Sequence, residues 1–138
     1  MGMTMIQDLD VLIIDDDPTV LQLIAEFLRS KGCNVECCED AHQGMDALHL
    51  RHFDLVVTDV KMAGMNGFEF LKMARASWPK IAIIVMTAYD DDYPLSQALR
   101  AGADGYLSKP FSLSKFSLIF EKAYWNALSR QDWWEEHA

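Results

Sequence analysis

The sequence predicts a single α/β domain in which five parallel strands are covered by helices on both faces. Short apolar, β-rich segments alternate five times with segments whose apolar residues recur at helical spacing. The joining stretches are short and polar or contain glycine, and no repeat, low-complexity region or interdomain linker interrupts the pattern. Strand–helix alternation requires crossover connections, which produce a parallel sheet buried between helical layers.

Size and composition fit one domain that handles a cation or a basic partner. The chain has 138 residues, of which 51% are hydrophobic, enough for one ordinary domain with a proper core. Twenty-one acidic residues against 12 Lys and Arg residues give a formal net charge of −9. This charge argues against direct nucleic-acid binding, which needs cations beside the phosphates. The three cysteines, an odd number, argue against a disulfide framework.

The sequence carries no signal for a membrane or for secretion. Its longest purely apolar run, Ile81–Met86, is far shorter than the ~20 residues of a transmembrane helix. No basic residue precedes Arg29, so the N-terminal segment does not resemble a secretory signal. We therefore expect a cytoplasmic protein.

The first half of the chain gives clear element boundaries. Asp17 followed by Pro18 is typical of a helix start, with the aspartate as N-cap and the proline in the first helical position. Lys31–Gly32 is expected to end this helix. The other elements expected in this half are strands at Leu9–Ile14, Asn34–Cys38 and Phe53–Thr58 and a helix at Ala41–Arg51.

The second half continues the alternation. Asn66–Gly67 is predicted as a turn. The strand predicted at Ile81–Met86 is the most apolar and is therefore expected to be central. The remaining expected elements are a strand at Gly105–Leu107 and helices at Phe68–Ser77, Tyr93–Ala101 and Ser112 to about Leu128. We expect the domain to span residues 8–128, with 129–138 as a tail or the start of a linker.

Polar residues follow the C-terminal ends of the predicted strands. They are Asp15, Asp16 and Asp17 after the first strand, Asp59 after the third, Thr87 after the fourth and Lys109 after the fifth. In an open parallel α/β sheet the binding site lies outside these strand ends, where the strand order reverses. For the flavodoxin-like order 2-1-3-4-5, that point falls between the first and third strands.

This set of side chains suits phosphoryl chemistry with a metal ion. Adjacent carboxylates repel and raise one another's pKa unless a cation holds them together. Mg²⁺ prefers oxygen ligands and often keeps waters or phosphate oxygens. A carboxylate can also act as a nucleophile and form an aspartyl phosphate, while a lysine and a hydroxyl stabilise the phosphoryl oxygens. We therefore predict a Mg²⁺ site that awaits a phosphoryl group.

Four motifs resemble the receiver domain of bacterial two-component response regulators. In that family's order and spacing they are "VLIIDDDP", "DLVVTDVKMAGMNGFEFL", "IIVMTA" and "AGADGYLSKPF". The resemblance runs from about Leu9 to Leu128, nearly the whole chain. It implies a phosphorelay protein whose partner is a sensor histidine kinase or a phosphotransfer protein. It also implies that the domain catalyses only its own phosphorylation and autodephosphorylation.

The resemblance implies a role for each residue of the acidic cluster. Asp59 is the phosphoacceptor. The ligands of Mg²⁺ are Asp15, Asp16, Asp59 and the backbone carbonyl of Lys61. Asp17 is the helix N-cap and not a ligand.

The resemblance also implies a switch. Thr87 reaches for the phosphoryl group, Lys109 pairs with it, and Tyr106 swings inward as the threonine moves. Lys109–Pro110 is expected to be a cis peptide bond of structural importance. The face made by the fourth helix, the fifth strand and the fifth helix then changes its affinity for a partner or a second copy. One departure from the family is Ala63, which stands where proline is usual and loosens the loop.

Two other functions stay open. A haloacid-dehalogenase-type phosphohydrolase would use Asp15 as nucleophile and Asp17 as acid/base, with Thr87 and Lys109 in its second and third motifs. That reading does not require Asp59, and it needs an acidic metal-binding motif after the lysine. The second alternative is an interaction domain that works without phosphorylation, against which the intact residue set argues.

Other features carry less weight. His42, His49 and His52 are better explained by a solvated helix face than by a metal site. The sequence has no helix-turn-helix or catalytic output module, so the output is expected from a separate protein, a homodimer or a further domain. Trp133 and Trp134 lie beyond the expected fold, and their role is not predicted.

Overall fold

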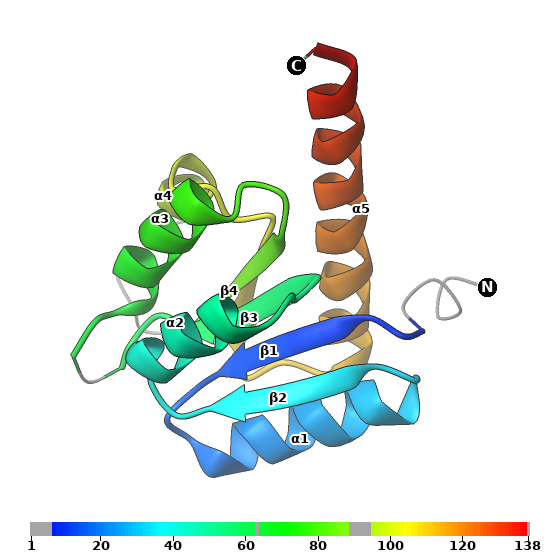
Figure 1. The fold of residues 1–138 in the computed structure, drawn as a ribbon. Coiled ribbons are helices and arrows are strands. Elements are labelled where there is room, and N and C mark those ends of the chain that lie inside the picture. Colours follow the sequence, from blue (N-terminus) through cyan, green and yellow to red (C-terminus); the bar gives the residue numbers. More distant parts are fainter. Residues whose placement is uncertain (1–6, 63, 89–94, 138) are drawn as a thin grey trace.

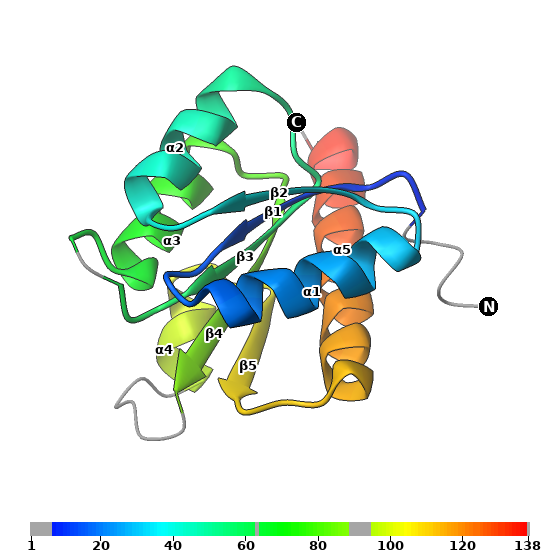
Figure 2. The same cartoon turned by 90° about the horizontal axis from the view of Figure 1, so that it is seen from below.

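The computed structural model describes residues 7–62, 64–88 and 95–137, with residues 131–137 as backbone only. Strands and helices alternate along these residues. The strands form one parallel sheet in the order β2-β1-β3-β4-β5. Figure 1 labels the first four strands, and Figure 2 labels all five. The predicted α/β class and the flavodoxin-like strand order are confirmed.

Most element boundaries agree with the prediction to within two residues. The strands are β1 (Asp10–Ile14), β2 (Asn34–Cys38), β3 (Leu55–Asp59), β4 (Ala82–Ala88) and β5 (Gly105–Lys109). The helices are α1 (Pro18–Ser30), α2 (Ala41–Leu50), α3 (Gly67–Ser77), α4 (Leu95–Arg100) and α5 (Leu113–His137). Tyr93, the predicted start of the fourth helix, and Ala63 lie outside the described residues.

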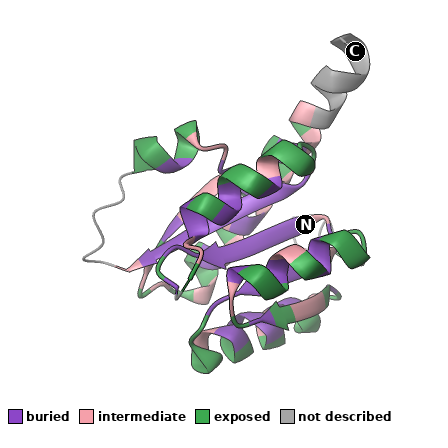
Figure 3. Cartoon of the chain, turned by 60° about the vertical axis from the view of Figure 1, so that its left-hand side comes forward, coloured by how far each residue is buried: buried purple, intermediate pink, exposed green. Residues whose placement is uncertain are grey.

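Helices cover the sheet on both faces. Figure 2 shows α1 and α5 on one side and α2, α3 and α4 on the other. Successive residues of a strand point to opposite faces, so Val11 and Ile13 join the core under α1 and α5, whereas Leu12 and Ile14 join the core under α2 and α3. The interior strands β1, β3 and β4 are consequently buried along most of their length, and Figure 3 shows buried strand residues in purple. The edge strands β2 and β5 are only partly buried.

The expectation that Ile81–Met86 forms the central strand is wrong. In the observed order β3 occupies the middle, and β4 lies between β3 and β5. Both β3 and β4 are interior strands with nearly every residue buried. A continuous apolar run indicates that a strand is buried on both faces. All interior strands share this property, so hydrophobicity alone could not show which of them lies in the middle of the sheet.

Side chains cap the helices next to the C-terminal edge of the sheet. Asp17 is the N-cap of α1, as predicted, and its Oδ1 accepts a hydrogen bond of 2.9 Å from the amide of Thr19. Asn66 is the N-cap of α3 and forms a capping box with Glu69. Gly67, predicted as a turn residue, is therefore the first residue of α3.

Helix α5 is longer than predicted. It was expected to end at about Leu128 but continues to His137 and extends beyond the sheet in Figure 1. Ala127 is buried against the sheet, and Arg130 donates a hydrogen bond of 3.0 Å to the carbonyl of Ile81. Among the described residues, no helix combines the length and hydrophobicity needed to cross a bilayer.

Candidate functional site

The predicted acidic cluster forms where β1 and β3 end. Ile14 of β1 lies opposite Thr58 of β3 in the parallel register, so the residues that follow them share one edge of the sheet. Asp15, Asp16 and Asp59 each offer a carboxylate oxygen, and these atoms lie within 4.8 Å of one another. Asp15 and Asp59, 44 residues apart in the sequence, thus meet at this edge of the sheet as predicted.

Backbone contacts hold the buried carboxylate of Asp15 in place. The amide of Asp15 bonds to the carbonyl of Cys38 at 3.1 Å, which continues the β1–β2 ladder past the strand. The Oδ1 atom of Asp15 accepts a hydrogen bond of 2.9 Å from the amide of Asp17. Asp15 is fully buried and Asp59 is 6% exposed, whereas Asp16 is exposed. The cluster therefore has a buried inner part and one carboxylate that reaches solvent.

Lys109 reaches the cluster from the end of β5. Its Nζ atom lies 2.7 Å from Oδ2 of Asp15 and 3.3 Å from Oδ2 of Asp59. The Lys109–Pro110 peptide bond is cis, as predicted. The lysine side chain is 21% exposed, so these ion pairs are partly shielded from solvent and stronger than pairs on an open surface.

The three aspartates and one lysine leave the cluster with excess negative charge. Burial and the neighbouring Asp15 raise the pKa of Asp59 from 3.8 to about 6, against the opposing effect of Lys109. Burial opposes the charge on Lys109, but its contacts with Asp15 and Asp59 outweigh burial and raise the pKa of the ammonium. Clustered oxygen donors with uncompensated charge fit a hard divalent cation such as Mg²⁺.

Thr87 and Tyr106 meet beside the cluster. Thr87 is buried near the end of β4, next to Ser108 of β5 in the register. Its Oγ1 donates a hydrogen bond of 3.1 Å to the phenol oxygen of the half-buried Tyr106. The sequence had placed both residues near the site but had not predicted this bond. In this structure, therefore, the threonine hydroxyl is engaged by Tyr106.

The sequence model of the response regulator receiver domain matches residues 11–120. The chain belongs to this family. It is 35% identical over 116 residues to the transcriptional regulatory protein ZraR of Escherichia coli strain K12, an alignment that covers 84% of this chain and 26% of ZraR. Receiver domains act in two-component signalling, and the pocket of Asp15, Asp16 and Asp59 fits the phosphoacceptor site of such a domain.

Solved receiver domains share the fold. One from Clostridium thermocellum is 28% identical with a TM-score of 0.76, and the match covers 90% of this chain and 97% of that one. The receiver domain of DrrB, solved in a BeF3-activated form, is 25% identical with a TM-score of 0.75, over 85% of this chain and 97% of that one. This chain spans about a quarter of the length of its ZraR relatives, so what those proteins do beyond the receiver portion is a separate matter.

The raised pKa of Asp59 predicts how the stability of this receiver domain depends on pH. The folded state keeps the proton of Asp59 up to about pH 6, whereas the unfolded chain loses it near 3.8. The unfolded state therefore gains stability relative to the folded state as the pH rises between these values. Without metal, we expect Asp59→Asn to gain about 2 kcal/mol over the wild type between pH 4 and pH 7. Urea unfolding of both proteins in EDTA measures this gain. A difference in the free energy of unfolding that stays constant from pH 4 to pH 7 would contradict the prediction.

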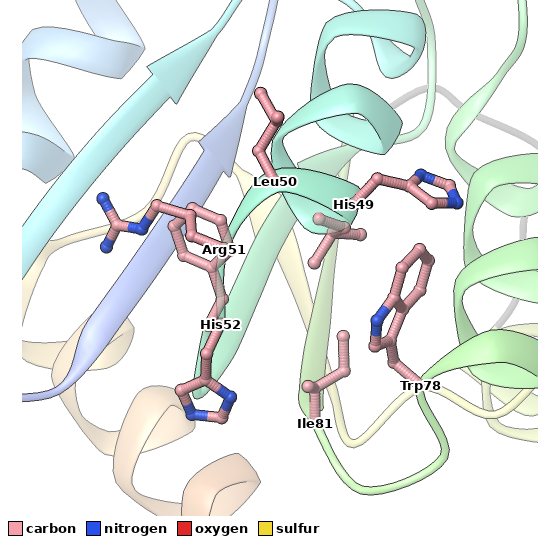
Figure 4. A pocket seen from close by; sticks show the side chains of 8 residues that line it. His49, Leu50, Arg51, His52, Trp78 and Ile81 are labelled. Atoms are coloured by element: carbon pink, nitrogen blue, oxygen red, sulfur yellow. The ribbon is translucent and has the colours of Figure 1, made fainter.

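Two of the histidines, His49 and His52, lie at the opposite edge of the sheet, whereas His42 in the first turn of α2 lies near Gly64. His49 and His52 line a pocket of about 270 Å³ beside the residues that precede β3 and β4. Figure 4 shows the ring of His49 beside Trp78, with centroids 5.0 Å apart, while His52 points away from the tryptophan. His52 instead contacts Asp54 at 3.1 Å. His42, His49 and His52 are exposed, which agrees with the predicted solvated face.

Proposed function

We propose that this receiver domain accepts a phosphoryl group on Asp59 from the phosphohistidine of a sensor kinase or phosphotransfer protein. The observation that carries this proposal is the meeting of three carboxylates from two neighbouring strand ends, with Nζ of Lys109 at 3.3 Å from Asp59. Asp15, Asp16, Asp59 and the carbonyl of Lys61 are the proposed Mg²⁺ ligands. When bound, the ion neutralises the charge that gathers on the phosphoryl oxygens during transfer.

The residues of the site have distinct tasks in the transfer. A carboxylate oxygen of Asp59 attacks phosphorus, the P–N bond to the donor imidazole breaks, and the electron pair of that bond stays on the imidazole. The ionised form of Asp59 is the nucleophile, so uptake at low metal concentration requires a pH above about 6. Lys109 exchanges its contact with Asp59 for one with the phosphoryl oxygens and keeps Asp15 as its second partner.

An apolar groove beside the site is the proposed docking surface for the phosphodonor protein. It has a volume of about 310 Å³, and Lys109 is part of its wall. The other lining residues are Val20 and Leu23 of α1, Ala88, and Pro110 and Phe111 after β5. Leu23 is 44% exposed, although it is a large hydrophobic residue. A partner that covers this groove brings its phosphohistidine to the edge where Asp59 lies and excludes water from the transfer.

Phosphorylation is proposed to move Thr87 and Tyr106 and so to change the face formed by α4, β5 and α5. Thr87 must release the phenol of Tyr106 before its hydroxyl can reach a phosphoryl group, which frees the tyrosine to move. The affected face carries large exposed side chains, namely Leu95 and Leu99 of α4 and Leu118 and Trp125 of α5. A shift between two states requires a few kcal/mol of differential stabilisation and would change the affinity of this face for a partner or a second copy.

Uptake of phosphate from a small donor tests the function. We expect the wild-type protein to gain one phosphoryl group from acetyl phosphate in the presence of Mg²⁺ and none in EDTA, with the label mapped to Asp59 by mass spectrometry of borohydride-reduced peptides. Beryllofluoride with Mg²⁺ should bind at the same residue, in keeping with the activated form in which the DrrB receiver domain was solved. Lack of uptake with an intact fold would favour an interaction domain that works without phosphorylation.

A further inference from the structure

A second cluster of charged residues lies far from Asp59, at the start of β5. The carboxylate of Asp104 is 2% exposed and lies between two guanidinium groups. Its Oδ2 atom is 2.8 Å from Nη2 of Arg75 and 3.2 Å from Nη2 of Arg130, while Oδ1 is paired with Nη1 of Arg130. The same Oδ2 accepts a hydrogen bond of 2.9 Å from the amide of Ile83. We refer to Arg75, Asp104 and Arg130 as the arginine lock.

The arginine lock connects four elements. Arg75 on α3 donates to the carbonyl of Gly102 at 2.8 Å and to that of Ile81 at 2.7 Å. Arg130 on α5 donates to the carbonyl of Ile81 at 3.0 Å. Ile81 immediately precedes β4, and Asp104 immediately precedes β5. The lock therefore fastens the last part of α5 to α3 and to the starts of two strands.

The start of β5 and α5 are also packed very closely. A side chain at Gly105 would place its Cβ atom 3.0 Å from Cγ2 of Ile119 and 3.4 Å from Cβ of Ala123, so these neighbours would have to move by a few tenths of an ångström to admit it. The side chain of Asn126 donates a hydrogen bond of 3.3 Å to the carbonyl of Asp104. A displacement of the start of β5 cannot be absorbed by free space at this contact.

The two ends of the lock have different relations to the rest of the domain. Asp104 lies two residues before Tyr106, which contacts Thr87 beside the phosphorylation site. Arg130 lies beyond residue 120, where the match to the receiver family ends. The lock thus connects a strand that reaches the site to a stretch of helix beyond the residues that match the family model.

We propose that the arginine lock makes the distal part of α5 move with β5, so that phosphorylation at Asp59 changes the environment of the C-terminal end of the helix. The proposal rests on the proposed function, because the displacement of β5 arises from phosphorylation. Burial lowers the pKa of Arg75 to about 10 and, together with the charge of Arg75, lowers the pKa of Arg130 to about 10, so both stay charged at neutral pH. Arg130 is the more exposed arginine, at 33% against 19% for Arg75, and can be replaced with less damage to the core.

Hydrogen exchange tests whether the lock holds the helix. In Arg130→Met, the amides between Ala123 and Arg130 are expected to exchange about tenfold faster than in the wild type, because one partner of a partly buried ion pair is lost. The amides of β1 and α1 should be unchanged, which shows that the fold is intact. Lys122→Met removes an exposed cation from the same helix and should leave exchange as in the wild type. Unchanged exchange in Arg130→Met would overturn the lock.

Fluorine NMR of the protein labelled with 5-fluorotryptophan tests whether phosphorylation at Asp59 affects the distal part of α5. Trp133 and Trp134 follow Arg130 in the sequence, so their signals report on the stretch beyond the lock. We expect these signals to shift when the wild type and Lys122→Met are phosphorylated with acetyl phosphate and Mg²⁺, and not to shift in Arg130→Met phosphorylated to the same extent. Absence of a shift in the phosphorylated wild type, or a full shift in Arg130→Met, would overturn the proposal that the lock transmits phosphorylation to the distal part of α5. A protein that takes up no phosphoryl group would overturn the proposed function and transmission with it, while hydrogen exchange would still decide the lock.

Discussion

The substitution Asp59→Asn is expected to abolish phosphoryl uptake from acetyl phosphate while leaving the fold intact. The amide of asparagine has the shape of the carboxylate but is not a nucleophile towards phosphorus. Lys109 keeps its contact of 2.7 Å with Asp15, so the ion pair that joins β5 to β1 survives the substitution. Intact-protein mass spectrometry measures uptake, and circular dichroism with urea unfolding checks the fold. A variant that is still labelled would contradict the assignment of Asp59.

Asp17→Asn is the matched control and also separates the receiver from the phosphohydrolase. Asp17 is an exposed carboxylate in the loop between β1 and α1, and asparagine caps a helix about as well as aspartate. The receiver mechanism therefore predicts normal uptake in Asp17→Asn and none in Asp59→Asn. The hydrolase mechanism predicts the reverse, with Asp15 labelled and Asp17 needed as acid/base. The structure favours the receiver, because the side chain of Asp17 already caps α1 through Thr19.

The acidic cluster could be predicted from the sequence because it depends on sheet topology alone. Parallel strands present their C-terminal ends at one edge, and the strand order then makes the residues after β1 and β3 neighbours. Asp15 and Asp59 needed no further information to be placed together. Thr87 and Lys109 were likewise expected on this edge from the sequence, but their contact partners could not be predicted. Whether the lysine contacts Asp15, Asp59 or both depends on the path of a long side chain past the ends of β4 and β3.

The arginine lock could not be predicted from the sequence because it too depends on where long side chains lie. Asp104 contacts residues 29 and 26 positions away, on two different helices. No periodic pattern links these positions, and each arginine alone is typical of an exposed helix surface. The full length of α5 was not predicted because its last turns carry mostly polar residues and two tryptophans. No proline or glycine marks a helix end in this stretch either. Such a stretch can form either a helix or an irregular tail, and a tertiary contact such as that of Arg130 stabilises the helix.

The substitution Gly67→Ala is expected to lower the free energy of unfolding by about 2 to 3 kcal/mol, although alanine is a better helix former. A Cβ atom at this position would lie 2.3 Å from the carbonyl oxygen of Asp59 and 2.7 Å from Cα of Val60. Both are backbone atoms of the strand end that carries the phosphoacceptor, so they cannot move aside without moving Asp59. The amide of Gly67 also donates a hydrogen bond of 2.8 Å to the carbonyl of Val60. We therefore expect slower phosphoryl uptake together with the loss of stability.

Gly64→Ala, in the loop before α3, separates the effect of lack of space from the effect of backbone strain. Gly64 has a φ of +78°, but its nearest neighbour is an atom of His42 at 3.9 Å from the Cβ position. Alanine should therefore cost only about 1 kcal/mol, through the positive φ, and should leave uptake unchanged. Urea unfolding and acetyl phosphate labelling of both variants make the comparison. If Gly67→Ala were as stable and as reactive as Gly64→Ala, close packing of α3 against the end of β3 could not be what positions Asp59.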